Sequence, residues 1–208
     1  RLTANPEDAK IRADWDNLAA DCLDWLQFLP LETRKRLGSY SQKDRSRWQQ
    51  QLYQLNLSNR VLYDLADAAF LQMFPQQRGQ NFMNKPINQV WYAIAEEKLQ
   101  AILKGNAYEK IEFDSGTSER QVSGRLKSGE GKTFVAELTE EQVMQLELEA
   151  DPQVLISVYS PTGKIKLMED SRNRTWDGDL PESGFYEFVV VSTASGKSDY
   201  QLKLIISE

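Results

Sequence analysis

The spacing of apolar residues divides the chain into two parts. Up to about residue 105, apolar side chains recur at every third or fourth position, which is the period of a helix buried along one face. From Tyr108 onward, apolar and polar residues alternate in short runs, which is the period of a β-strand. The pattern predicts an α+β protein with two segregated domains, an all-α helical bundle over residues 1–107 followed by an antiparallel β-sandwich over residues 108–208.

The helical half is predicted to contain five helices. The first ends at Pro30 and the fourth at Pro75, because proline cannot continue the hydrogen-bond ladder. Ser58 or Asn59 can cap the fourth helix, and Gly105 follows the last one as a C-terminal cap. The first helix carries an apolar stripe of Trp15, Leu18, Ala19, Cys22, Trp25, Leu26 and Leu29. The later helices are expected at residues 31–37, 44–55, 57–74 and 87–103.

The stripes of the first and last helices include a cysteine and a lysine. Cys22 is the only cysteine, so an intrachain disulfide is excluded, and we expect it to be a small buried core residue. Lys98 shares the apolar stripe of the last helix with Ile94 and Leu99.

The second half is predicted to contain short strands separated by turns. The strand-like runs lie near residues 111–113, 122–126, 134–138, 144–148, 155–159, 165–167, 185–191 and 200–206. The turn residues between them include Ser128-Gly129, Asp151-Pro152, Pro161-Thr162-Gly163 and Ser195-Gly196. Short strands with such regular turns favour a β-sandwich of about 100 residues. The border between the halves is expected between Gly105 and Ser118.

The segment from Asn173 to Ser192 is the most informative single stretch of the β-half. Turn-forming residues, among them Asp177, Gly178 and Pro181, lead directly into the apolar run Phe185–Val191. That order predicts a tight surface loop that feeds a core strand of the sandwich.

Charge and composition narrow the functional classes. Residues 1–108 carry 14 basic and 12 acidic side chains and residues 109–208 carry 11 and 19, so the net charges are +2 and −8. No excess of basic charge points to a nucleic-acid partner. The chain contains no histidine, which excludes histidine-based triads and most transition-metal sites. It begins at Arg1 rather than Met, as expected of a processed form or an excised piece, and a removed export or anchoring segment stays open.

Five stretches of the β-half occur in a characteristic order, residues 122–126, 131–134, 154–163, 180–186 and 199–202. Together they resemble the bacterial pre-peptidase C-terminal (PPC) domain family. This resemblance implies a jelly-roll-like sandwich over residues 119–206 that accompanies a catalytic domain without being one. It also implies an extracytoplasmic location, periplasmic or secreted.

Three stretches of the helical half, residues 62–65, 74–80 and 89–95, also occur together in other proteins. They are similar to a region of cyanobacterial proteins that include some serine/threonine kinases. This similarity implies a regulatory or sensory role, and a cytoplasmic location if the chain belongs to a kinase. No kinase signature, such as the glycine-rich loop or Asp-Phe-Gly, occurs in the sequence.

A cluster of oxygen-bearing side chains precedes the core strand. Asp170, Asn173, Asp177 and Asp179 could supply the hard ligands that calcium prefers, and Glu182 lies close by. The spacing departs from the EF-hand pattern, and Asp and Asn also form turns through their own backbone. Solvated turns and a calcium site both stay open, and no other cofactor is predicted.

Two further groups are candidates for partner binding. Trp176 could plug the end of the sandwich or stack on a sugar or peptide. A basic stretch could instead be a solvated helix face or could contact an anionic protein or lipid headgroups at a membrane surface. Its members are Arg34, Lys35, Arg36, Lys43, Arg45 and Arg47, followed by Trp48.

No catalytic constellation is recognisable. The carboxylate pairs Glu96-Glu97 and Glu140-Glu141 are adjacent and point apart on a helix, and no Gly-x-Ser-x-Gly elbow occurs. The segment 128–133 lacks the spacing of a phosphate-binding loop. We therefore predict a non-enzymatic accessory module with a protein or ligand partner. The alternatives are a regulatory region of a larger cyanobacterial signalling protein and a carboxylate-only hydrolase, and the oligomeric state stays open.

Overall fold

The computed structural model describes residues 8–10, 12–13, 26–27 and 29–207. Most of the first predicted helix, with Cys22, lies outside these residues. Leu29, at the end of that helix, is buried against the helices that follow. Within the described segments, no helix has the length and apolar character needed to cross a membrane.

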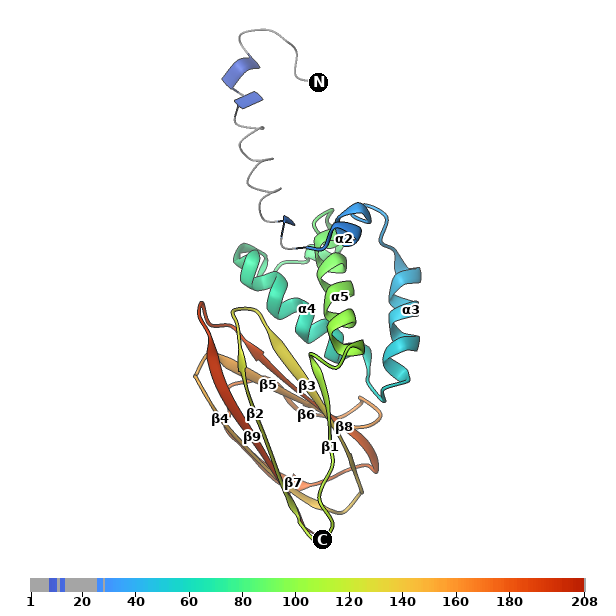
Figure 1. Ribbon diagram of the computed structural model, residues 1–208, viewed down its shortest axis with the longest axis vertical. Helices are drawn as coiled ribbons and strands as arrows, with labels where there is room; N and C mark the ends of the chain where they lie inside the picture. The colour runs from blue at the N-terminus through green and yellow to red at the C-terminus, as the bar shows by residue number, and fades with distance from the viewer. Residues whose placement is uncertain (1–7, 11, 14–25, 28, 208) are drawn as a thin grey trace.

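Helices α3, α4 and α5 lie where the sequence pattern places them, within about two residues at each end. The helical bounds are α2 Leu31–Lys35, α3 Gln42–Tyr53, α4 Asn59–Met73 and α5 Asn88–Leu103, with 3-10 turns η2 Pro75–Gln77 and η3 Phe82–Asn84. Figure 1 shows these helices grouped on one side of the β-sandwich.

The helix ends follow local chemistry. Ser41 and Asp44 form a capping box at the start of α3, in which the Ser41 N–H donates to Asp44 Oδ2 at 2.9 Å. Gly105 follows α5 with φ +76°, and its N–H donates to the Ile102 carbonyl at 2.9 Å. Ser58 occupies the N-cap position of α4 as predicted, but its hydroxyl donates to Glu187 in the sandwich instead of capping the helix.

The strands form two sheets. The inner sheet, which faces the helices, has the order β1-β3-β8-β5-β6, and the outer sheet has the order β2-β9-β4-β7. Most connections between β2 and β9 cross from one sheet to the other, as in a jelly roll, while β1 is added parallel to β3. The strand bounds are β1 Tyr108–Ile111, β2 Glu119–Leu126, β3 Gly131–Leu138, β4 Val143–Ala150, β5 Val154–Tyr159, β6 Lys166–Ser171, β7 Thr175–Asp179, β8 Gly184–Ser192 and β9 Ser198–Ser207.

Two hydrophobic cores share the inner sheet. Between the sheets, Phe134, Phe188 and Leu202 belong to a core to which only residues of the β-half contribute. On the opposite face, Val135 and Val189 join the core formed by the helices. The predicted β-sandwich is thus confirmed, whereas the helices form a layer on the inner sheet and share its core. The two halves are segregated along the sequence but not in packing.

The prediction of a loop around Trp176 is wrong. Residues Thr175–Asp179 form strand β7, which pairs antiparallel with β4 and brings Trp176 opposite Leu146. Because β7 is a short edge strand, it tolerates turn-forming residues that a central strand would not. The loop that leads into β8 is therefore confined to residues 180–183.

Candidate functional site

The junction between the helices and the inner sheet contains buried ionisable side chains. Glu187 points from β8 toward α4 and is 4 % exposed. Its carboxylate accepts hydrogen bonds from the Ser58 backbone N–H and from the Ser58 hydroxyl, the latter at 2.6 Å. Burial raises the pKa of Glu187, and these two hydrogen bonds offset part of that rise. The pair ties the start of α4 to the central strand of the sheet.

A second contact across the junction joins Asp64 of α4 to Tyr159 of β5. The Tyr159 hydroxyl donates to Asp64 Oδ2 at 2.8 Å. Burial raises the pKa of Asp64 to about 7, and the nearby charge of Asp170 adds to the rise. Burial also raises the pKa of Tyr159 well above its ordinary value, so the phenol keeps its proton and stays a donor.

Asp64 lines a small cavity of about 90 Å³ together with Asp67, Arg78 and Asp170. Asp67 accepts a hydrogen bond from Trp91 Nε1 at 2.6 Å, and burial raises its pKa. Asp170 has a positive φ of +45° on a strand that pairs irregularly with β5. Across the described segments, no group of three or more Asp, Glu, Cys or His side chains is arranged to hold a metal ion.

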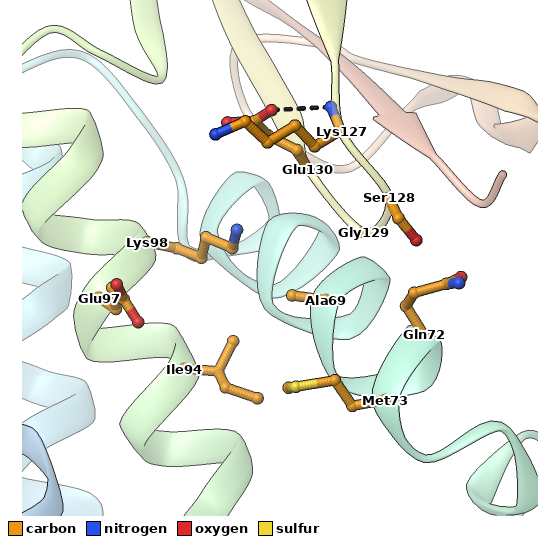
Figure 2. A pocket seen from close by; sticks show the side chains of 10 residues that line it. All are labelled: Ala69, Gln72, Met73, Ile94, Glu97, Lys98, Lys127, Ser128, Gly129 and Glu130. Atoms are coloured by element: carbon orange, nitrogen blue, oxygen red, sulfur yellow. Dashed lines mark hydrogen bonds between the residues drawn. The ribbon is translucent and has the colours of Figure 1, made fainter. Parts of the chain in front are cut away.

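The larger opening at the junction is a groove of about 450 Å³ between α4, α5 and the turn that joins β2 to β3 (Figure 2). We call it the junction groove. Its lining residues are Ala69, Gln72 and Met73 from α4, Ile94, Glu97 and Lys98 from α5, and Lys127, Ser128, Gly129 and Glu130 from the turn.

The turn packs closely against α4 because residue 129 is glycine. A Cβ atom at this position would lie 3.1 Å from the Ala69 Cα and 3.1 Å from the Gln72 Cβ, and φ is +67°. The Gly129 N–H donates to the Ser192 carbonyl at 3.1 Å. Glu130 closes the turn by accepting a hydrogen bond from the Lys127 N–H at 2.8 Å, drawn as the dashed line in Figure 2. A side chain at 129 would displace this wall of the groove.

Lys98 is the unusual side chain of the groove. Figure 2 shows it extending from α5 toward the β2–β3 turn, above Ile94 and Met73. Burial lowers the pKa of its ammonium, and Glu130 and Glu97 oppose that change from a distance. Its Nζ atom makes no hydrogen bond or ion pair with any side chain of the described residues.

The four candidate calcium ligands do not converge. Asp170 lies at the junction, where Arg78 faces it. Asp177 and Asp179 are exposed on β7, in register with Gln145 and Val143 of β4. The backbone N–H of the exposed Asn173 donates to the Ser171 hydroxyl at 3.1 Å. Calcium binding stays a prediction, which thermal melting with calcium and with a chelator would test. Trp176 packs against the core between the sheets, beside Gly178.

Much of the basic stretch is engaged inside the helical layer. Arg36 and Arg47 both form ion pairs with Asp44 and Glu96, and Trp48 donates from Nε1 to Glu96 at 3.3 Å. Trp48 itself is fully buried. These charges are therefore largely balanced within the fold.

The remaining members of the stretch are placed less uniformly. Lys35 pairs with Glu32 at 2.7 Å on the surface. The Arg45 guanidinium lies 5.0 Å from the Tyr63 ring centroid and 5.5 Å from that of Tyr92. Arg34 is partly buried, and its Nε has no hydrogen-bond partner. Binding of an anionic partner by this stretch stays a prediction.

The sequence contains charged residues at apolar helical positions of the junction, but the apolar pattern alone did not identify them as parts of a site. Asp64 and Asp67 are three residues apart on α4 and flank its apolar positions, and Lys98 lies on the apolar stripe of α5. A charged residue on an apolar helical face indicates an unusual environment. The position of the β2–β3 turn against α4 could not be read from one sequence.

No protein-family model matches the chain. The serine/threonine-protein kinase-like protein E of Synechocystis sp. is 32 % identical to it over 189 residues. That alignment covers 88 % of this chain and 31 % of the kinase-like protein, so the chain spans about a third of the length of this curated relative.

Solved structures show looser similarity, which covers about half of the chain. A periplasmic inhibitor of g-type lysozyme from Aeromonas hydrophila, PliG, has a TM-score of 0.42 and 18 % identity, covering 49 % of this chain and 96 % of that one. The pre-peptidase C-terminal domain of a collagenase from Bacillus anthracis has a TM-score of 0.35 and 7 % identity, covering 48 % and 94 %.

Proposed function

We propose that the chain is a non-catalytic binding module whose binding surface is the junction groove. One observation carries this proposal, namely the lining of the groove. It combines an apolar floor with the unpaired Lys98 in an opening of about 450 Å³. Pockets that hold small ligands or side chains of a partner are commonly of this size and mix apolar walls with a few polar groups.

The fold supports this assignment because the groove needs both halves of the chain. Its helical walls come from α4 and α5, and its third wall is the β2–β3 turn, held in place by Gly129. We retain as part of the proposal that residues 119–206 form a PPC-like sandwich serving a catalytic partner, on the strength of its five ordered sequence stretches.

An NMR screen tests the assignment. A library of small polar and amphipathic fragments is added to the labelled protein, and amide shifts are mapped. We expect the shifts to cluster on the turn at Gly129 and on α4 and α5 around Met73 and Lys98. Shifts confined to the exposed face of the outer sheet, or no saturable shifts at all, would contradict the proposal.

A pair of glycine variants sharpens the screen. Gly129→Ala should displace the turn from α4 and weaken binding in the groove, since the added Cβ meets Ala69 and Gln72. Gly116→Ala is the matched control, because Gly116 also has a positive φ, of +84°, but nothing lies within 4 Å of its added Cβ. Equal loss of binding in both variants would point to general destabilisation instead.

A second candidate function is regulation of a larger signalling protein. The similarity to the kinase-like protein E over 88 % of this chain favours it. In that case the groove would receive a ligand or a segment that changes the activity of a catalytic region elsewhere in the same protein. In a protein that contains both this chain and a kinase catalytic region, Lys98→Met should then alter kinase activity without altering expression. Unchanged activity with an intact catalytic region would exclude this role.

A further inference from the structure

The side chain of Lys98 has no charged partner in the part of the fold that the structure describes. It leaves α5 beside Ile94 and Leu99, on the face that packs against the rest of the fold. The side chain is half-buried in the groove, and this partial burial weakens the hydration of the ammonium group. No carboxylate of the described residues forms an ion pair with it in return. A half-buried ammonium that has no carboxylate partner in the groove can serve as the anchor for an anion that enters from solvent.

The groove around Lys98 offers an apolar floor and a polar rim. Ala69, Met73 and Ile94 form the floor, and Figure 2 shows the Met73 and Ile94 side chains approaching each other below Lys98. Ser128 and Gln72 bring a hydroxyl and an amide to the opposite side of the opening. A ligand that reaches Lys98 from the surface therefore passes hydrogen-bonding groups and rests on apolar ones.

The other charges that face the groove limit the charge of the ligand. Glu130 and Glu97 line it, as does Lys127, so the four charged side chains sum to zero when all are ionised. The Glu130 carboxylate is held by the Lys127 N–H and closes the turn. Burial raises the pKa of Glu97, and the nearby charge of Lys98 offsets part of that rise. A ligand with one negative charge neutralises the Lys98 ammonium, whereas a dianion such as a phosphate monoester adds a second negative charge to a groove that already contains two glutamates.

Resting on the proposed binding function of the groove, we infer that it binds a small organic monocarboxylate with a short apolar tail. The carboxylate pairs with the Lys98 ammonium, while the tail covers Met73, Ile94 and Ala69. The ion pair fixes the orientation of the ligand. Burial of the apolar tail contributes binding free energy that increases with the length of the tail.

Binding is tested with a series of straight-chain carboxylates from acetate to hexanoate at constant ionic strength. We expect about fourfold tighter binding for each added methylene that reaches the floor. At tenfold excess over Kd, the melting temperature should rise by about 3 °C. Titrations followed by the Gly129 and Lys98 amide signals report whether the ligand occupies the groove. A response that does not increase with chain length would overturn the inference.

Lys98→Met is the decisive variant, because methionine keeps the length and apolar stem of the side chain and removes its charge. It should abolish the response to hexanoate and raise the melting temperature of the ligand-free protein. Lys104→Met, at the exposed C-cap position of α5, is the matched control and should respond as wild type does. Retained hexanoate binding in Lys98→Met would overturn the inference.

Hexanol separates failure of this inference from failure of the proposed function. If hexanol and hexanoate bind the groove equally well in wild type, the groove is a binding site without selectivity for a carboxylate, and only the ligand assignment falls. If the wider fragment screen and the carboxylates all leave the groove signals unchanged, the binding function falls as well.

Discussion

The two faces of the inner sheet differ in the chemistry that they bury. The face toward the outer sheet packs Phe134, Phe188 and Val190 against apolar residues such as Leu202. The face toward the helices packs Val135 and Val189, but it also buries Glu187 and holds Tyr159 against a carboxylate.

The face toward the outer sheet is therefore an apolar core, whereas the face toward the helices is an interface that contains ionisable groups. Several ionisable groups lie at or near the junction. Burial raises the pKa of Asp64, Asp67, Glu97 and Glu187 and lowers that of Lys98, so in each case it disfavours the charged form. Such groups lower stability unless partners or protons compensate for their burial. Regions of this kind are often where proteins bind ligands or respond to conditions. The core between the sheets provides the rigid support for that interface.

Truncation of the core between the sheets should have the largest effect. Phe188→Ala removes a fully buried ring between the sheets and should lower the free energy of unfolding by about 3–5 kcal/mol. Val189→Ala, its neighbour on the helix-facing side, removes less volume and should cost about 1–3 kcal/mol. Urea titration of both variants measures the difference. A larger loss for Val189→Ala would reverse the roles that we assign to the two faces.

Removal of the partner of a buried carboxylate should have an intermediate effect. Ser58→Ala deletes the hydroxyl that donates to Glu187 at 2.6 Å, and the loss should be about 1–3 kcal/mol. Ser46→Ala is the control, since the Ser46 hydroxyl makes only an exposed bond to the Gln42 carbonyl at 3.3 Å. Thermal melting of both variants should show a clear decrease for Ser58→Ala alone. Equal melting temperatures would mean that this contact contributes little.

The smallest effect is expected on the exposed face of the outer sheet. Arg125 and Asp199 pair there at 2.5 Å, but both side chains are largely exposed. Ion pairs in water contribute little because solvent screens them. Arg125→Ala should leave the melting temperature unchanged within error at physiological salt. A drop comparable to that of Ser58→Ala would show that the outer face is more than a solvated surface.

Most helices and strands could be located from the sequence, whereas strand β7 and the packing of the elements against one another could not. Helical periodicity and Pro75 located α4, and the continuous apolar run Phe185–Val191 indicated the most buried strand. That run is continuous because β8 is covered on both faces, by helices on one side and by the outer sheet on the other. By contrast, β9 alternates because one of its faces meets solvent.

The parts that could not be predicted depend on contacts between distant residues. Trp176 belongs to a strand because β4 lies beside it, although its neighbours Asp177 and Gly178 favour turns. The junction groove requires the 127–130 turn to meet α4, some 60 residues earlier in the chain. Glu187 is likewise acceptable in a buried strand only because Ser58 reaches it.

The most direct test of the contrast between the two faces is the dependence of stability on pH. The pKa of Asp64 is raised in the folded protein to about 7, from a value of 3.8 for an unperturbed aspartate. Its contribution is therefore fully present at low pH and is lost as pH rises through 7. The free energy of unfolding of wild type should be greater at pH 6 than at pH 8, by about 1 kcal/mol from Asp64 alone.

The decisive measurement is urea unfolding of wild type and Asp64→Asn at pH 6 and pH 8. Asparagine keeps the shape of the side chain and cannot ionise, so the difference between the two pH values should shrink by about 1 kcal/mol in the variant. Asp67, Asp170, Glu97 and Glu187 shift in the same direction and leave a smaller residual slope. An identical pH dependence in wild type and Asp64→Asn would contradict the account of the junction as an interface that buries ionisable groups.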